Sequence, residues 1–267
     1  MSDTTAVPAS TVTSTLLEEG RVLRLVVDRP KGNILDKATM EALGAALTRH
    51  QGDLKLKLVL LRGAGGHFSF GASVEEHRPA QAPAMLRTLH TLVRQIATFP
   101  VPVAALVEGR CLGGAFEVVL CCHLVLATRN ARFACPEVKL GVFPPVLAAA
   151  GATRLGGALA ERLALTGDEI DAQTALGCGF ASAILPGESD PESEALAWYR
   201  QRLAPLSAFS LRATTRAARE GSGLLAALGE PLDRTERAYL EHLLPSHDGN
   251  EGIEAFLARR PPAWQDA

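Results

Sequence analysis

The stretch Cys111-Leu112-Gly113-Gly114-Ala115-Phe116-Glu117 follows an apolar run, Val103–Val107, and leads into a second apolar run. The pattern predicts a strand, a glycine turn and a helix. The first amides of a helix lack an intrahelical acceptor, and glycine lets a ligand oxygen approach the backbone. Glu117 falls in the same first turn. A glycine pair before a first-turn glutamate also suits plain helix packing, so this segment alone indicates a site only weakly.

Outward from this stretch, strand and helix patterns alternate, which favours an α/β fold containing parallel strand pairs. From Pro191 onward the pattern is helical, with proline and glycine breaks. We therefore expect a disordered lead at 1–15, a core at 16–190 and a C-terminal helical region at 191–267. The expected strands are 22–27, 56–61, 103–107 and 124–127. The expected helices are 37–50, 83–99, 114–122, 154–165 and 172–176, and Asp36 is the expected N-cap of the first of them.

Two loops contain further candidates. Ser73 and Glu76 have the spacing of a capping box, so a helix is expected just after Ser73, with the amide of Ala72 left before it. Glu137 follows Pro136 in a loop, where an isolated glutamate is more often a solvated surface residue. His77 could line a pocket, although a capped surface helix is the simpler interpretation. The segment 141–145 is expected to be a rigid turn.

Charge and composition exclude several classes of function. The 27 Lys and Arg residues nearly balance 29 Asp and Glu residues, which argues against a nucleic-acid partner. No apolar run has the length of a membrane span, and the amino terminus lacks the features of a signal peptide. The five cysteines form no CxxC pair, and the seven histidines have no metal-ligand spacing. We expect a cytoplasmic protein without a metal site or a membrane partner.

Several blocks together resemble the crotonase (enoyl-CoA hydratase/isomerase) superfamily. Their order and spacing match, and the likeness extends from about Leu16 to the C-terminus. The blocks are His67-Phe68-Ser69-Phe70-Gly71-Ala72-Ser73, 109–117, 133–141, Thr166-Gly167-Asp168, and Glu251-Gly252-Ile253-Glu254-Ala255-Phe256-Leu257 with Arg259-Arg260.

The resemblance implies a fold, a site and an assembly. The implied fold is a spiral of ββα units with a C-terminal helical region, assembled as a homotrimer or homohexamer. The amides of Ala72 and Gly114 would form an oxyanion hole, and Glu117 and Glu137 would be the two catalytic glutamates, with acid and base not assigned between them. The substrate would be an acyl-coenzyme A thioester, and no cofactor would be needed. Expected contacts of the substrate and its coenzyme A are Lys31, Phe70, Ser73, Val74, Phe143, Pro144 and, from a neighbouring subunit, Phe256.

One segment departs from the family pattern and narrows the expected substrate. Val142-Phe143-Pro144-Pro145-Val146 stands where many members have a flexible, glycine-rich run, and its prolines stiffen the backbone. Three strings, 31–36, 68–77 and 139–143, resemble a subgroup of the family. The resemblance implies addition of water to a cyclic dienoyl thioester, turning cyclohexa-1,5-diene-1-carbonyl-CoA into 6-hydroxycyclohex-1-ene-1-carbonyl-CoA. A straight-chain enoyl-CoA hydratase, an enoyl-CoA isomerase, and a non-catalytic binding protein of the same fold remain alternatives.

Overall fold

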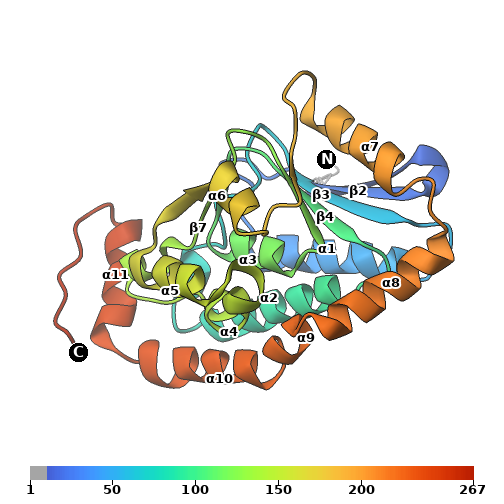
Figure 1. Ribbon diagram of the computed structural model, residues 1–267. Coiled ribbons are helices and arrows are strands. Elements are labelled where there is room, and N and C mark those ends of the chain that lie inside the picture. The colour runs from blue at the N-terminus through green and yellow to red at the C-terminus, as the bar shows by residue number, and fades with distance from the viewer. Residues whose placement is uncertain (1–10) are drawn as a thin grey trace, which may run out of the picture.

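The computed structural model describes residues 11–267, and its centre is a six-stranded sheet (Figure 1). The strand order is β1-β2-β3-β4-β6-β9. Strand β1 pairs antiparallel with β2, and every other pair in this sheet is parallel. The bounds are β1 Val12–Leu17, β2 Val22–Val27, β3 Leu58–Gly63, β4 Val103–Val107, β6 Leu124–Ala127 and β9 Ala183–Ile184.

A second, three-stranded sheet carries the turn on which the sequence argument began. Its order is β5 (Arg110–Leu112), β7 (Arg132–Ala134) and β8 (Glu169–Asp171). Strand β5 follows β4 directly in the chain and leads into helix α3 (Gly114–Cys121), so Gly113 is the turn between the second sheet and that helix. The pairs β4–β5 and β6–β7 thus move from one sheet to the other before the next α-helix, as expected for ββα units.

Helices cover both faces of the large sheet (Figure 1). Helices α1 and α2 lie along one face, where the larger apolar core also includes α3. Helix α7 lies on the opposite face, where Tyr199 packs on strand residues such as Leu60 and Leu106. The remaining α-helical bounds are α1 Lys37–His50, α2 Ala82–Ala97, α4 Pro145–Leu155, α5 Gly157–Thr166, α6 Ala172–Gly177, α7 Pro191–Arg202, α8 Ala208–Gly221, α9 Leu224–Ala227, α10 Glu230–Ala238 and α11 His247–Leu257.

Four short turns complete the chain. Three are 3₁₀ turns: η1 Glu18–Gly20, η2 Glu75–His77 and η3 Pro136–Leu140. The fourth, η4 (Tyr239–Leu243), is a π-helical turn that extends α10. Among the described residues, no helix combines the length and the apolar character needed to cross a membrane.

The expected α/β class and the C-terminal run of helices are confirmed, but three local predictions are wrong. The lead was expected to reach residue 15, whereas β1 already begins at Val12; residues 1–10 lie outside the described part. A helix, α4, begins at Pro145, where a rigid turn was expected. The Ser73 capping box does not form, because the Glu76 carboxylate accepts a hydrogen bond from the amide of Lys37 instead.

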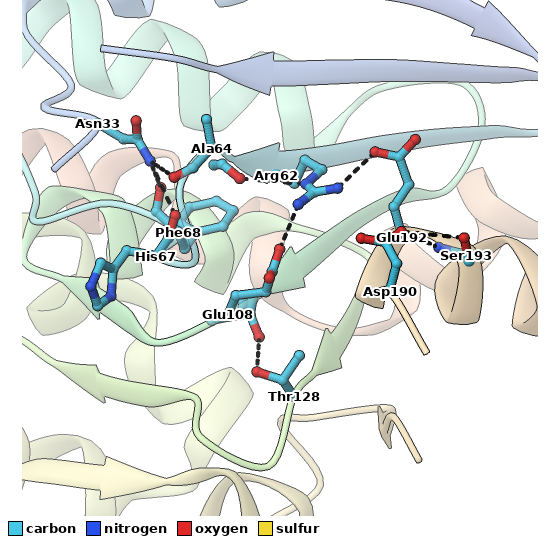
Figure 2. A network of polar contacts seen from close by, with 12 residues as sticks. Asn33, Arg62, Ala64, His67, Phe68, Glu108, Thr128, Asp190, Glu192 and Ser193 are labelled. Atoms are coloured by element: carbon cyan, nitrogen blue, oxygen red, sulfur yellow. Dashed lines mark hydrogen bonds and ion pairs between the residues drawn. The ribbon is translucent and has the colours of Figure 1, made fainter. Parts of the chain in front are cut away.

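Polar contacts fix the loop that leads from β3 toward Ala72. The Asn33 side-chain amide donates to the carbonyls of Ala64 and His67, at 2.8 and 3.1 Å (Figure 2). The amide of Leu35 donates to the Gly71 carbonyl at 2.9 Å. Asn33 is buried, so these bonds form away from water, where they hold the backbone most firmly.

A half-buried ion-pair network ties helix α7 to the same end of the sheet. Arg62 lies between Glu108 and Glu192, with nitrogen–oxygen distances of 2.8 and 2.7 Å (Figure 2). Arg24 also contacts Glu192, at 2.9 Å. Arg62 at the end of β3 is therefore held between Glu108, which follows β4, and Glu192 on α7. Loops toward the site start from these two strand ends.

Candidate active site

Two adjoining cavities lie beside the Gly113 turn. The outer cavity has a volume of about 580 Å³ and is lined by Phe70, Val74 and Phe256, among others. The inner one is only about 10 Å³, which is room for one water molecule. Both cavities are lined by Ala72, His77 and Glu137, so the second is the deep end of the first.

Two backbone amides flank the deep end. Ala72 and Gly114 approach each other closely, since a Cβ placed on Gly114 would lie 3.6 Å from the amide nitrogen of Ala72. Within residues 11–267, neither amide donates to a protein acceptor. Gly114 is the first residue of α3, where a free N–H is the rule. Two free donors in one small volume suit an oxygen that gains negative charge.

A glycine with positive φ precedes each of these amides. Gly71 has φ 104° and Gly113 has φ 52°, which are angles that L side chains rarely adopt. There is also no space for a side chain: a Cβ on Gly71 would lie 2.8 Å from the Leu112 carbonyl oxygen, and one on Gly113 would lie 2.7 Å from Glu137 Oε1. The sequence blocks contain glycine at both positions because the backbone must turn there beside close neighbours.

Glu117 is held at the junction of two helices. Its side chain is 2% exposed, and it lies in the first turn of α3. Its Oε1 accepts the amides of Val146 and Leu147 at 2.7 and 2.9 Å. These amides open helix α4, so the partial positive charge of that helix end favours an ionised carboxylate. The Val146 and Leu147 amides are available because the first amides of a helix have no intrahelical acceptor, and Pro145 suits the position before them because it has no N–H to satisfy.

Glu137 is buried with far less support. It lies in the 3₁₀ turn η3 and is 8% exposed. Its Oε2 is buried, and the described residues offer it no hydrogen-bond partner. The expectation of a solvated loop glutamate is therefore wrong, because η3 turns this side chain inward against Gly113.

The two carboxyls have raised proton affinities. Burial raises the pKa of Glu117 to about 7, although the amides of α4 counteract part of the effect. Burial, and then the charge of Glu117, raise the pKa of Glu137 to about 8. The pair therefore holds about one proton near neutral pH, and that proton resides mainly on Glu137.

The other residues expected at the site are divided between the cavities and their surroundings. Phe70, Val74 and Phe256 line the outer cavity and Phe143 lines the inner one. Phe256 of this same chain lines the outer cavity, because α11 packs against η2 and η3, and the expected contact from a neighbouring subunit stays a prediction. Lys31, Ser73 and Pro144 line neither cavity; the inner wall has Pro145 where Pro144 was expected.

His77 faces both cavities, and its neighbours fix its protonation. The pKa of His77 is lowered by burial, so the ring is neutral. Its Nδ1 lies 2.8 Å from the Ser73 carbonyl oxygen. A carbonyl can only accept, so Nδ1 carries the hydrogen and Nε2 is left as an acceptor.

Sequence reasoning missed three polar or charged residues that line the cavities. Arg110 and Lys139 belong to the outer wall, and the Tyr239 ring belongs to the inner one. Arg110 and Lys139 lie within the recognised blocks 109–117 and 133–141 and could have been found as the basic residues of those blocks. Tyr239 lies in a helical stretch with no motif, so nothing in the sequence indicated it. Among the described side chains, no group of three His, Cys, Asp or Glu residues is arranged to hold a metal.

Comparisons with known proteins point to one family. Residues 18–267 match the family described as enoyl-CoA hydratase/isomerase. The chain is 42% identical to the cyclohexa-1,5-dienecarbonyl-CoA hydratase of Thauera aromatica, over 94% of this chain and 95% of the relative. It is 33% identical to the 2,3-dehydroadipyl-CoA hydratase of Escherichia coli (strain K12), over 92% and 95%. A solved enoyl-CoA hydratase from Mycobacterium avium subsp. paratuberculosis K-10 superposes with a TM-score of 0.83 at 31% identity, covering 97% of this chain and 100% of that one.

Proposed function

The chain belongs to the enoyl-CoA hydratase/isomerase family, and on that premise we propose that it adds water to a cyclic, conjugated dienoyl-CoA thioester. Family membership makes it an enzyme. The proposed substrate is cyclohexa-1,5-diene-1-carbonyl-CoA and the product 6-hydroxycyclohex-1-ene-1-carbonyl-CoA. The relative from Thauera aromatica supports this ring substrate, and its printed name describes the same activity.

One observation carries the chemistry: two free amides and two buried carboxyls meet at one small cavity. The amides of Ala72 and Gly114 would bind the thioester oxygen, which becomes an enolate oxygen during the addition. One donor of this kind typically contributes about 3 kcal/mol to the transition state. Glu117 and Glu137 would transfer the protons, which contributes roughly 10²–10⁴-fold in rate.

In the first step, water attacks the β-carbon of the ring. One O–H bond of the water breaks and its proton passes to Glu117, while a C–O bond forms. The electron pair of the attacked double bond moves toward the thioester oxygen, which the two amides stabilise. Glu117 suits the role of base because two amides of α4 favour its ionised form.

In the second step, Glu137 gives its proton to the far carbon of the former diene. The enolate electrons return, a new double bond forms between the two original ones, and the thioester oxygen becomes neutral again. The result is a 1,4-addition. Glu137 suits the role of acid because its pKa is raised to about 8. The proton on Glu117 must then return to Glu137 before the next turnover.

The cavity walls support a rigid acyl group. Phe143 packs edge-on against Tyr239, with ring centroids 5.4 Å apart, and Pro145 begins the adjoining helix. Rings and prolines adapt little, so a flat ring would lose less entropy here than a flexible chain. The outer cavity would hold the pantetheine arm between Phe70, Val74 and Phe256. Lys31 is exposed next to Gly32, which packs on the Phe70 ring, and it would meet a phosphate of coenzyme A.

The deciding experiment compares two substrates on the purified enzyme. We expect kcat/KM for cyclohexa-1,5-diene-1-carbonyl-CoA to exceed that for crotonyl-CoA by at least about tenfold, with the product identified by mass spectrometry and NMR. Equal or faster hydration of crotonyl-CoA would instead support a straight-chain hydratase, and double-bond migration without water uptake would support an isomerase. Binding of coenzyme A thioesters with no turnover at all would support a non-catalytic member.

The assembly, location and cofactor requirement are also proposals. We propose a homotrimer or homohexamer, to be tested by light scattering of the purified protein. The free thiols of all five cysteines suit a reducing compartment such as the cytoplasm. The reaction as written balances with water and two carboxyls, so we propose that it proceeds without a cofactor, and dialysis against a chelator should leave kcat unchanged.

A further inference from the structure

Tyr239 lines the deep end of the site together with the two glutamates. It is the first residue of the π-helical turn η4, at the end of α10, and it is 1% exposed. It lines the inner cavity together with Glu117, Glu137 and Phe143. Because the edge of the Phe143 ring packs against it, the phenol ring has little freedom to turn. Isolated π turns of this kind occur often at functional sites.

The hydroxyl of Tyr239 is buried and has no hydrogen-bond partner among the described residues. An unsatisfied buried hydroxyl costs stability, so a tyrosine in such a place needs an explanation. Glu137 Oε2, which lines the same cavity, also lacks a partner. The two groups do not bond to each other, and the space of about 10 Å³ beside them fits one water molecule.

The chemistry of the cavity sets the direction of the hydrogen bond. Burial, and then the charges of Glu137 and Glu117, raise the pKa of Tyr239, so its phenol stays protonated while the enzyme works. Ionised Glu117 is an acceptor, His77 presents Nε2 as an acceptor, and Phe143 and Pro145 offer no side-chain donor or acceptor. Besides protonated Glu137, whose proton is needed at the far carbon, the neutral phenol is the side-chain O–H donor that lines this end of the cavity.

We propose that Tyr239 is a catalytic residue whose hydroxyl donates a hydrogen bond to the oxygen atom that is added to the substrate. This inference rests on the proposed function. In a 1,4-addition Glu137 must face the far carbon of the diene. The attacking water therefore has only Glu117 as a carboxyl partner, which accepts its proton. A second hydrogen-bond partner is needed to orient the water oxygen toward the β-carbon. The hydroxyl of Tyr239 would hold the water oxygen during attack and the product hydroxyl after it.

The chain contains a matched control. Its only other tyrosine, Tyr199, is also 1% exposed and also has a hydroxyl without a partner among the described residues. Tyr199 lies on α7 in the smaller apolar core, on the opposite face of the sheet from α3. Replacing each tyrosine by phenylalanine removes the same buried, unpaired hydroxyl, once inside the site and once outside it.

The experiment measures kcat, KM and Tm for Tyr239→Phe, Tyr199→Phe and the wild type. We expect Tyr239→Phe to lower kcat about 10-fold to 100-fold, as for loss of one oriented donor, with KM changed by less than about threefold. Tyr199→Phe should keep kcat within about twofold. Neither change should lower Tm, because removing an unpaired hydroxyl does not break a hydrogen bond.

The rates are compared on whichever enoyl thioester the wild type hydrates fastest. The outcome therefore separates the proposed ring substrate from the proposed role of Tyr239. If that substrate is a straight chain, the ring assignment fails while the role of Tyr239 is still measured. The role of Tyr239 is overturned if its phenylalanine variant keeps wild-type kcat, if the loss lies wholly in KM, or if both variants lose kcat equally.

Discussion

The two ends of helix α3 differ in how completely their polar groups are satisfied. At the C-terminal end, the carbonyls of Leu120 and Cys122 accept hydrogen bonds from Arg154, at 3.1 and 3.2 Å. Arg219 reaches the Cys121 carbonyl at 3.0 Å. At the N-terminal end, the amide of Gly114 is free among the described residues and buried carboxyls surround it.

This difference separates stability from chemistry within one short helix. Positive side chains at the C-terminal end complete its hydrogen bonds and complement the helix dipole. Buried acids and unpaired groups at the other end cost stability, a cost that is expected at a functional site and that the proposed substrate would offset on binding. The contrast predicts that changes at the C-terminal end lower stability and leave kcat nearly unchanged, whereas changes at the N-terminal end lower kcat.

The largest effect is expected for the glutamates themselves. Glu117→Gln and Glu137→Gln should each lower kcat by about 10²–10⁴-fold, because an amide cannot exchange the proton. Steady-state kinetics with the cyclic thioester measures the change. Coenzyme A thioester binding, followed by calorimetry, should persist in both variants. A full-rate variant at either position would remove that glutamate from the mechanism.

The pH dependence of the rate follows from the same pair. The active form has one ionised and one protonated carboxyl, and the pKa values are about 7 and about 8. We therefore expect a narrow bell in kcat/KM, falling about tenfold per pH unit on either side. A flat profile between pH 5 and 10 would contradict the assignment.

Stability should respond to pH with a definite sign. Both folded pKa values lie above the ordinary value of 4.5, so the folded protein holds more protons than the unfolded chain between about pH 4.5 and 8. This contribution to the free energy of unfolding is present at low pH and is lost as pH rises through that window. Urea titrations at a series of pH values measure this effect. The free energy of unfolding of Glu137→Gln should fall less steeply with rising pH than that of the wild type.

A smaller effect on kcat is expected at Gly113, the turn before helix α3. In Gly113→Ala, the new Cβ would lie 2.7 Å from Glu137 Oε1 at φ 52°, so the carboxyl must shift. We expect kcat to fall about 10-fold to 100-fold, with a loss of about 1–3 kcal/mol in stability. Gly157→Ala is the control, because a Cβ there meets no atom within 4 Å. It should leave both quantities near wild type.

The smallest effect on kcat is expected at the C-terminal end of α3, where the carbonyls accept hydrogen bonds from arginines. Arg219→Met leaves the Cys121 carbonyl without this donor, and Arg219 is only 6% exposed. The free energy of unfolding should fall by about 1–3 kcal/mol while kcat stays within about threefold. Arg216→Met on the same helix removes only a surface pair with Glu220 and should cost about 0.5 kcal/mol or less. A large loss of kcat in Arg219→Met would break the contrast between the two ends.

Sequence reasoning succeeded where one local pattern decides one element. The apolar runs at β2, β4 and β6 were predicted at their observed bounds, and the Asp36 side chain caps α1 by accepting the Thr39 amide. It failed where a pattern has two interpretations. The serine- and threonine-rich start of β1 reads as disorder, yet pairing with β2 makes it an edge strand. A pair of prolines reads as a turn, yet Pro145 begins α4.

The site was predictable to the extent that it lies in recognisable blocks. Glu117 and Gly114 share one turn, so their proximity follows from spacing alone. The burial of Glu137 and the presence of Tyr239 depend on how η3 and α10 pack against other elements, which no local pattern records. The place of Phe256 beside the cavity of its own chain was unpredictable for the same reason, because it depends on the packing of α11 against η2 and η3.

The scattered origin of the site has a consequence for how the chain acquires activity. Ala72, Gly114, Glu137 and Tyr239 lie in separate loops and helices between residues 72 and 239, and Tyr239 reaches the others only once α10 docks on α4. A refolding chain can therefore regain its sheets and nearly all its helical signal in circular dichroism while it is still inert. Recovery of turnover would time the last docking event, which spectroscopic probes of secondary structure do not detect.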